Sequence, residues 1–486
     1  RAFYKYLLLE NLFTKNPTPT LYYIVHAIQF FALAFFLTRI LKNYTSNRKL
    51  IYLVIVFLTL TAGFTYSWFR LHMVERDIVL LLAAFLYCYL RYQKNQKLIW
   101  LLFATVAANI AIYYKEFPSI LIGTYAVAYL VLSARNREDD KRIRIFNITL
   151  LISAAIYLVL YAILVLPLGG IRSYGVGEYS SLEVLTKNFL NYLFVSDPLI
   201  ILVVLPLTFW RVYRVFIRKD VAQPFHDSLL AASSMYVIGH FVLKVGGDVH
   251  YLQPVYITVL PPLFYYLREY LRQKPWKYAL TLSVVLVLVN TIPMGLHYLT
   301  FFKYSPANLG TTVEFLARDI KERSPKSRPS IFLDGVGRTT GKWTYFVFSE
   351  HLLYRGLTAG EFDLRSDTGE EFSDAYFPYL GKIPTPFTVF EKGPVPEIAK
   401  GDYLVISTHS LDRNKAPDNT VYLKSLESSY ELLFRTQSRF AIPLINLKEI
   451  GRYFISIGAQ PGERLLGVSR HKPSPQIPDY YVFIRK

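Results

Sequence analysis

The chain has 486 residues, 53% hydrophobic, 16% aromatic and only 18% charged, with a mean hydropathy of +0.27, which is too apolar for a soluble enzyme of this length. The net charge of +19 does not indicate a nucleic-acid partner, because residues 1–303 hold 30 Lys and Arg against 14 Asp and Glu, whereas residues 304–486 hold 24 against 21. The single cysteine, Cys88, excludes a disulfide framework and a Cys-rich zinc site. We therefore expect a polytopic membrane protein.

Ten apolar stretches are long enough, or nearly so, to cross a bilayer core of about 30 Å, which takes about 20 helical residues. The third of them is the shortest. They are residues 21–41, 50–69, 78–91, 97–113, 117–133, 145–167, 199–217, 228–244, 251–271 and 277–301.

Basic residues are distributed unequally between the two alternating sets of connections. The set 39–49, 91–97, 134–144, 211–227 and 268–277 holds 20 Lys and Arg, against 6 in the set 70–77, 113–118, 168–197 and 244–250. The basic set is expected in the cytoplasm, where its residues determine topology and contact anionic lipids. We therefore expect an integral protein of the plasma membrane, or of the ER in a eukaryote, with everything after residue 302 on the outer or lumenal face. An outer N-terminus also predicts one more span upstream of Arg1.

From residue 304 the hydrophobic runs shorten and the charges balance, so a second domain is predicted over 304–486. Residues 311–323 and 343–355 have helical periodicity. Helices mixed with strands indicate an α/β or α+β domain, predicted to lie outside the cytoplasm. The predicted strands are residues 330–334, 388–390, 403–407, 430–434, 453–457 and 480–484.

The acidic residues of 1–303 lie in connections, and three short connections on the predicted outer side combine acid with base. A short connection keeps its charges at the membrane interface, where charge is costly unless it is paired or used. Acid, base and cation at one membrane surface suit a site for a phosphate-bearing lipid and a polar acceptor. The three turns contain Glu75-Arg76-Asp77, Lys115-Glu116 before Pro118, and Gly246-Gly247-Asp248 followed by His250 and Tyr251.

Each turn also has a purely structural interpretation. Asp77 could offset the dipole of a helix that begins there, which is worth about 0.3–1 kcal/mol. Lys115 could extend to the interface while Glu116 starts a helix with Pro118 in its first turn. Gly246 and Gly247 could simply form a turn, although two glycines also let backbone amides approach an anion.

Four stretches resemble the GT-C superfamily of membrane glycosyltransferases, which use polyprenyl-phosphate sugars and include protein O-mannosyltransferases, the lipid A aminoarabinose transferase and arabinofuranosyltransferases. The resemblance covers residues 1–303, and its order and spacing are more specific than any one stretch. An Arg of the family pattern is replaced near His250-Tyr251. The stretches are Asn16-Pro-Thr-Pro-Thr-Leu-Tyr-Tyr23, Arg70-Leu-His-Met-Val-Glu-Arg-Asp77, Tyr114-Lys-Glu-Phe-Pro118 and Asp248-Val-His-Tyr-Leu-Gln-Pro-Val-Tyr256.

The resemblance implies transfer of a sugar from a polyprenyl-phosphate donor to a glycan, lipid or protein acceptor on the outer face, with membrane lipids as further partners. A carboxylate would take the proton of the acceptor hydroxyl, and cations would stabilise the leaving phosphate. The main acidic motif of the family would precede Arg1, and a divalent cation such as Mg²⁺ or Mn²⁺, with Asp77 as a ligand, stays open. The implied catalytic residues are Asp77 and Glu75, and the implied donor phosphate or sugar-binding residues are Arg76, Lys115, Glu116, Asp248, His250 and Tyr251.

Two other functions stay open from the sequence. A transporter of a lipid-linked substrate would be favoured by acidic residues in span cores or by inverted repeats, and neither is visible. A non-catalytic subunit of a membrane complex with the same fold would differ from an enzyme mainly in the segment before Arg1.

Overall fold

The computed structural model divides into two compact units, residues 1–299 with 445–451 and residues 300–444 with 452–486. The predicted boundary lies at residue 303, and the division falls inside one helix, α14 (Ile292–Arg323). The predicted strands 388–390 and 453–457 and most of the predicted helix 343–355 lie outside the described residues. Those described are 19–70, 73–137, 140–164, 185–186, 189–242, 249–323, 328–334, 348, 351–358, 360–366, 398–408, 419–437, 442–447, 449–451, 464–465, 468–469, 477 and 479–486.

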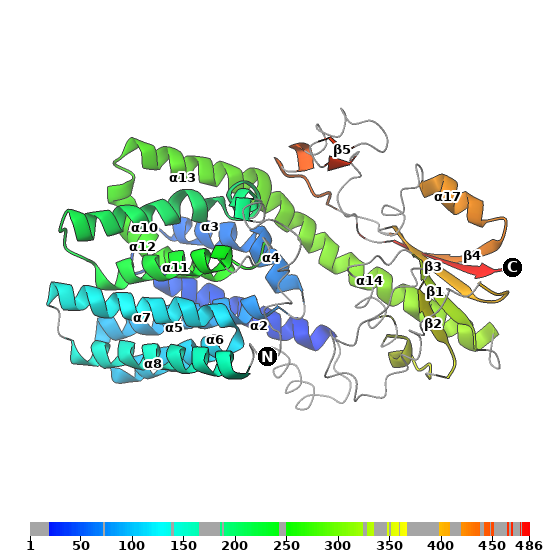
Figure 1. Ribbon diagram of the computed structural model, residues 1–486, viewed down its shortest axis with the longest axis horizontal. Helices are drawn as coiled ribbons and strands as arrows, with labels where there is room; N and C mark the ends of the chain where they lie inside the picture. Colours follow the sequence, from blue (N-terminus) through cyan, green and yellow to red (C-terminus); the bar gives the residue numbers. More distant parts are fainter. Residues whose placement is uncertain are drawn as a thin grey trace. The chain divides into compact units, whose positions relative to one another are not determined.

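The first unit is a helical bundle (Figure 1). Many large apolar side chains on its exterior are exposed, as is typical of a membrane-embedded protein. Within the described residues, five helices are long and apolar enough to cross a membrane, and α3 with α4 would make a sixth. The predicted number of ten spans therefore stays a prediction. The helices are α2 (Pro19–Leu41), α3 (Arg48–Thr59), α4 (Ala62–Phe69), α5 (Val74–Asn95), α6 (Leu98–Tyr114), α7 (Glu116–Asn136), α8 (Lys141–Leu164), α10 (Leu205–Val212), α11 (Pro224–Val242), α12 (Gln253–Tyr270) and α13 (Lys274–Leu286), with π-helical turns η3 (Tyr192–Ser196), η4 (Ile200–Val204), η5 (Tyr213–Ile217) and η6 (Val287–Thr291).

The helix predicted over 50–69 as one span is broken in the structure, where α3 and α4 meet at 67°. Thr61 leaves the helical conformation, with φ −64° and ψ 150°, and its hydroxyl donates to the Leu58 carbonyl at 2.7 Å. A glycine of α14 packs directly on this bend, since a Cβ on Gly295 would lie 2.2 Å from the Leu60 carbonyl oxygen. The sequence signal of a continuous apolar run could not reveal this contact.

The bundle is held together by a large aromatic and aliphatic core. Helix α5 packs against α6, α2 and α12, and α7 packs against α11 and α8. Tyr89 of α5 stacks on Phe225 of α11 with 4.7 Å between ring centroids, and Tyr125 of α7 lies edge-on to Phe85. The polar ends of the helices are capped locally: the Asn47 side chain accepts from the Leu50 amide at the start of α3, and Asp140 accepts from two amides at the start of α8.

The second unit contains a five-stranded mixed sheet in the order β2-β1-β3-β7-β4. β1 is parallel to β2 and β3, whereas β7 is antiparallel to β3 and β4. Four predicted strands are confirmed, and β2 was missed because Asp363-Leu-Arg-Ser366 lacks apolar alternation. The strands are β1 (Ser330–Asp334), β2 (Asp363–Ser366), β3 (Tyr403–Ser407), β4 (Tyr430–Arg435), β5 (Arg464–Leu465), β6 (Val468–Ser469) and β7 (Tyr480–Arg485), of which β5 and β6 pair separately.

Helices cover both faces of this sheet. Ile331 and Leu333 of β1 pack with Leu316 and Ile320 of α14, whose C-terminal part includes the predicted helix 311–323. Phe332, between them in β1, points to the opposite face and packs with the cluster that includes Leu423 of α17 (Asn419–Leu426). This alternation is the period-2 burial of a strand between two layers.

Candidate functional site

Three of the predicted turns meet at one end of the bundle. The Lys115 ammonium forms an ion pair with the Glu75 carboxylate, and the His250 ring Nε2 lies 4.0 Å from the same carboxylate oxygen. Glu75 and His250 are buried, with 3% and 8% of their side chains exposed, and Lys115 is 18% exposed. One carboxylate therefore joins segments that are 40 and 175 residues apart in the sequence.

The start of a long helix brings each of these residues to the cluster. Glu75 lies in the first turn of α5, and Lys115 precedes α7 in an extended conformation. His250 lies in the turn before α12, where its carbonyl accepts from the Gln253 amide at 3.3 Å. A helix N-terminus carries a partial positive charge of about half an elementary charge. Three such termini and two basic side chains therefore lie together here with the carboxylates of the first turns of α5 and α7.

Aromatic rings surround the basic groups. The ring of Tyr66 in α4 stacks on His250, with 4.9 Å between centroids and 4° between planes. The Lys115 ammonium lies 4.5 Å from the centroid of the Tyr251 ring. Helix α4 can approach this closely because of Gly63, where a Cβ would lie 2.4 Å from the Val249 carbonyl oxygen. Aromatic rings therefore frame both basic side chains of the site.

Arg76 and Asp77 turn toward α2 rather than toward Lys115. The Arg76 guanidinium donates to the Ser67 and Arg70 carbonyls, both at 3.2 Å, and lies 3.3 Å from His26 Nδ1. Asp77 accepts from the Gln29 amide at 2.8 Å. Successive residues of a helix are rotated by about 100°, so three neighbouring ionisable residues acquire three different sets of partners.

The structure thus brings together Glu75, Lys115, His250 and Tyr251, and it also gives Arg76 and Asp77 contacts with α2. Glu116 begins α7 and its carbonyl accepts from Ser119 at 2.5 Å. Asp248 lies outside the described residues. Sequence analysis missed His26, Gln29 and Tyr66. His26 and Gln29 had a usable signal, since they are polar residues one turn apart in an otherwise apolar helix.

A metal site does not form from the described part of the chain. Among these residues no three His, Cys, Asp or Glu side chains lie close enough to hold a metal ion. Asp77, the residue that the family resemblance implies as a ligand, accepts from the Gln29 side-chain amide through one of its two carboxylate oxygens. A divalent cation at Asp77 therefore stays a prediction.

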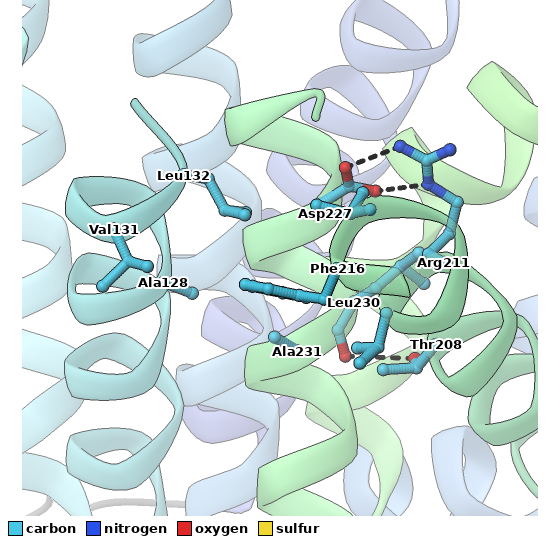
Figure 2. A pocket seen from close by; sticks show the side chains of 11 residues that line it. Ala128, Val131, Leu132, Thr208, Arg211, Phe216, Asp227, Leu230 and Ala231 are labelled. Carbon is cyan, nitrogen blue, oxygen red and sulfur yellow. Dashed lines mark hydrogen bonds and ion pairs between the residues drawn. The ribbon is translucent and has the colours of Figure 1, made fainter. Parts of the chain in front are cut away.

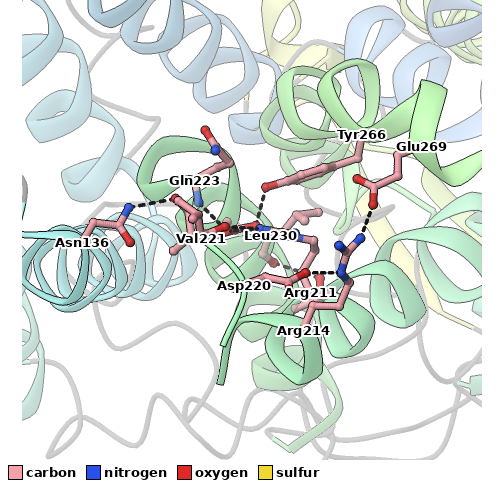
Figure 3. Close-up of polar contacts among 12 residues, drawn as sticks. Asn136, Arg211, Arg214, Asp220, Val221, Gln223, Leu230, Tyr266 and Glu269 are labelled. Atoms are coloured by element: carbon pink, nitrogen blue, oxygen red, sulfur yellow. Dashed lines mark hydrogen bonds and ion pairs between the residues drawn. The ribbon is translucent and has the colours of Figure 1, made fainter. Parts of the chain in front are cut away.

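A second polar cluster lies at the opposite, basic end of the bundle. Arg211 of α10 donates two hydrogen bonds to Asp227 of α11, both at 2.8 Å (Figure 2). The same carboxylate accepts from the Gln223 backbone N–H and from the Tyr266 hydroxyl (Figure 3). All its acceptor positions are occupied by these bonds, so this buried pair links α10, α11 and α12 and is structural.

No protein-family model and no curated protein matches this sequence. The resemblance to membrane glycosyltransferases therefore depends on the four sequence stretches, and the geometry of the helix ends is independent of it.

Proposed function

We propose that this protein is a membrane glycosyltransferase that moves a sugar from a polyprenyl-phosphate donor to a glycan, lipid or protein acceptor. The sequence stretches that resemble GT-C enzymes include those around Glu75, Lys115 and His250, and these residues are in contact. The bundle is apolar outside, as a protein that uses a lipid-linked substrate requires.

The observation that supports the proposal best is the balance of charge at the Glu75 cluster. One carboxylate faces a lysine, a histidine and the N-termini of α5, α7 and α12. Backbone amides at helix N-termini and basic side chains are the groups that bind phosphate in proteins. The Glu75 carboxylate contacts both basic side chains, and a donor phosphate would bind the same two groups.

The chemistry follows from these groups. The acceptor hydroxyl oxygen attacks the anomeric carbon, its bond to the phosphate oxygen breaks, and the hydroxyl proton passes to a carboxylate. Lys115 and His250 stabilise the charge on the leaving phosphate. Glu75, which contacts both basic side chains, is the first candidate for this carboxylate, and Asp77, which accepts from Gln29 of α2, is the second. A single displacement inverts the configuration at the anomeric carbon.

The placement of the site in the cell is part of the proposal. The Glu75 cluster lies at the end of the bundle opposite the basic connections, so under the positive-inside rule we expect it on the outer or lumenal side. Acceptors in the cell envelope or the ER lumen would meet the donor there.

The test is donor consumption by the full chain in proteoliposomes. The substrates are polyprenyl-phosphate-linked mannose, arabinofuranose and aminoarabinose, each with an extract of native membranes as acceptor source, and the readout is released polyprenyl phosphate. Glu75→Gln should lower the rate about 100-fold or more, the scale of a positioned acid or base. The matched control is Asp140→Asn, because Asp140 is a capping carboxylate at the other end of the bundle. This variant should consume donor at the wild-type rate. Binding of donor without consumption would instead indicate a non-catalytic subunit.

A further inference from the structure

A small apolar cavity lies on the side of the bundle, between α7, the α10–η5 segment and α11 (Figure 2). Its volume is about 160 Å³, and an engineered apolar protein cavity of about 150 Å³ is known to bind benzene. Figure 2 shows Ala128, Val131 and Leu132 on one wall, with Thr208 and Leu230 on the other. The space therefore suits a short length of hydrocarbon.

The cavity opens on the surface of the bundle that faces lipid. Three residues of its rim are large, apolar and about half exposed: Val131 at 52%, Val212 at 47% and Phe216 at 47%. Two of the helices that form this rim belong to segments apolar enough to cross a membrane, so the surrounding medium there is expected to be hydrocarbon. Molecules that reach the opening therefore come from the bilayer.

The cavity lies at the membrane depth expected for the part of an acyl chain nearest its headgroup. Ala128 lies eight residues before Asn136, the last residue of α7, so the cavity is within roughly 12 Å of the helix end at 1.5 Å per residue. A chain that enters it would keep its headgroup at the level of the basic connections.

A positive charge lies at the depth expected for the headgroup of such a lipid. Arg135 is exposed, donates to the Val215 carbonyl at 2.8 Å and lies 5.4 Å from the centroid of the Phe216 ring, so it adjoins two residues of the cavity wall. Arg218, two residues after Phe216, is also exposed. By contrast Arg211, which lines the cavity, is neutralised by Asp227. The charge is thus outside the cavity, where a headgroup would lie, and the inside is apolar.

We infer that this cavity binds one acyl chain of an anionic phospholipid whose phosphate contacts Arg135, in the leaflet on the basic side of the membrane. The inference is independent of the sugar-transfer proposal, because it uses neither Glu75 nor the end of the bundle where Glu75 lies. Such a lipid would fill the space between α7 and α10 and stabilise the bundle by binding only its folded form.

The test is lipid binding to the full chain in detergent, measured by native mass spectrometry with dioleoyl phosphatidylglycerol and dioleoyl phosphatidylcholine. The anionic lipid should bind at least about fivefold more tightly, which corresponds to about 1 kcal/mol for one basic residue near an anionic headgroup. Arg135→Gln should remove that preference. Ala128→Leu, which fills the cavity, should weaken both lipids about tenfold.

Two variants serve as matched controls. Lys94→Gln removes an exposed charge at the same end of the bundle, and Ala155→Leu makes the same enlargement on the exposed face of α8; both should bind lipid as the wild type does. Equal affinity for the two lipids in the wild type would overturn the headgroup contact. If Ala128→Leu binds lipid as tightly as the wild type, or if the control variants lose as much lipid affinity as the test variants, the cavity is not the lipid site.

Discussion

Three consecutive ionisable residues, Glu75, Arg76 and Asp77, are all buried at the start of α5. From the sequence we expected Arg76 to join Lys115 and His250 at one phosphate. In the structure Lys115 and His250 both contact Glu75, while Arg76 binds backbone carbonyls near α4. The shared phosphate stays a prediction, and the rotation along the helix, which depends on where α5 begins, determines which partners each of the three residues meets.

Asp77 gives a test at the level of one residue. Asp77→Asn retains the oxygen that accepts from Gln29, so the fold and the melting temperature should change little. If Asp77 acts on the acceptor, the transfer rate should fall about 100-fold or more, because the amide cannot take a proton. The measurement is turnover beside thermal unfolding. A rate close to that of the wild type would exclude Asp77 from the chemistry.

Tyr403 gives a pH test in the second unit. Burial, and then the neighbouring Asp319 carboxylate to which its hydroxyl donates at 2.8 Å, raise the pKa of Tyr403 above its usual value. The unfolded chain loses this proton near pH 10, while the folded chain keeps it to a higher pH. The contribution of Tyr403 to the free energy of unfolding is therefore fully present below about pH 10 and is lost as the pH rises further. Tyr403→Phe should cost about 1.5–3 kcal/mol at pH 8 and reduce the loss between about pH 9 and 11.

Urea unfolding of the full chain, read by pulse proteolysis of the sheet, measures this effect. Tyr354→Phe is the control, since Tyr354 is 63% exposed. An identical pH slope in Tyr403→Phe and the wild type would contradict the assignment.

At the level of elements, the approach of α4 to the turn before α12 depends on Gly63. Gly63→Ala would place a Cβ against the Val249 carbonyl, so backbone must move, at a cost of about 1–3 kcal/mol. Donor binding should fall as well, because His250 follows Val249. Gly239→Ala is the matched control: its Cβ would meet side chains at 3.6 Å, an ordinary contact. If Gly63→Ala and Gly239→Ala unfold at the same temperature, the close approach of α4 to the Val249 carbonyl is refuted.

The Arg211–Asp227 pair gives a second test between elements. Asp227→Asn leaves a buried guanidinium without its charge partner and should cost about 3–5 kcal/mol. Arg211→Met combined with Asp227→Leu should cost less than the single change, because no buried charge then stays unpaired. Asp220→Asn, whose carboxylate is 29% exposed and pairs with Arg214, should cost less than about 1 kcal/mol. These differences are measured as shifts of the unfolding transition.

Helices and strands were predictable where hydrophobic patterning alone determines them. The stretches at 117–133 and 145–167 correspond to α7 and α8, and the alternation at 330–334 and 403–407 to β1 and β3. The bend at Thr61 and the short strand β2 were not predictable, because contacts distant in the sequence produce them: Gly295 against Leu60, and β1 beside residues 363–366.

For the whole chain, the orientation that we expect in the membrane depends on the 20 Lys and Arg in one set of connections against 6 in the other. In a Cys88→Ala background, Lys424→Cys should react with an impermeant maleimide on intact cells, and Lys97→Cys only after permeabilisation. Both lysines are exposed, so access is set by the membrane. Reaction at position 97 alone would reverse the orientation, and with it the outer placement of the Glu75 cluster.

Phosphate binding at the cluster of Glu75, Lys115 and His250 can be measured by itself, apart from sugar transfer. Binding of decaprenyl phosphate and of decaprenol, which lacks the phosphate, is compared for the full chain in detergent. The wild type should prefer the phosphate, and Lys115→Ala should weaken its binding about tenfold or more without affecting decaprenol. Lys94→Ala, an exposed lysine at the opposite end, should have no effect. Equal binding of decaprenyl phosphate to the Lys115→Ala variant and the wild type would contradict the proposed site.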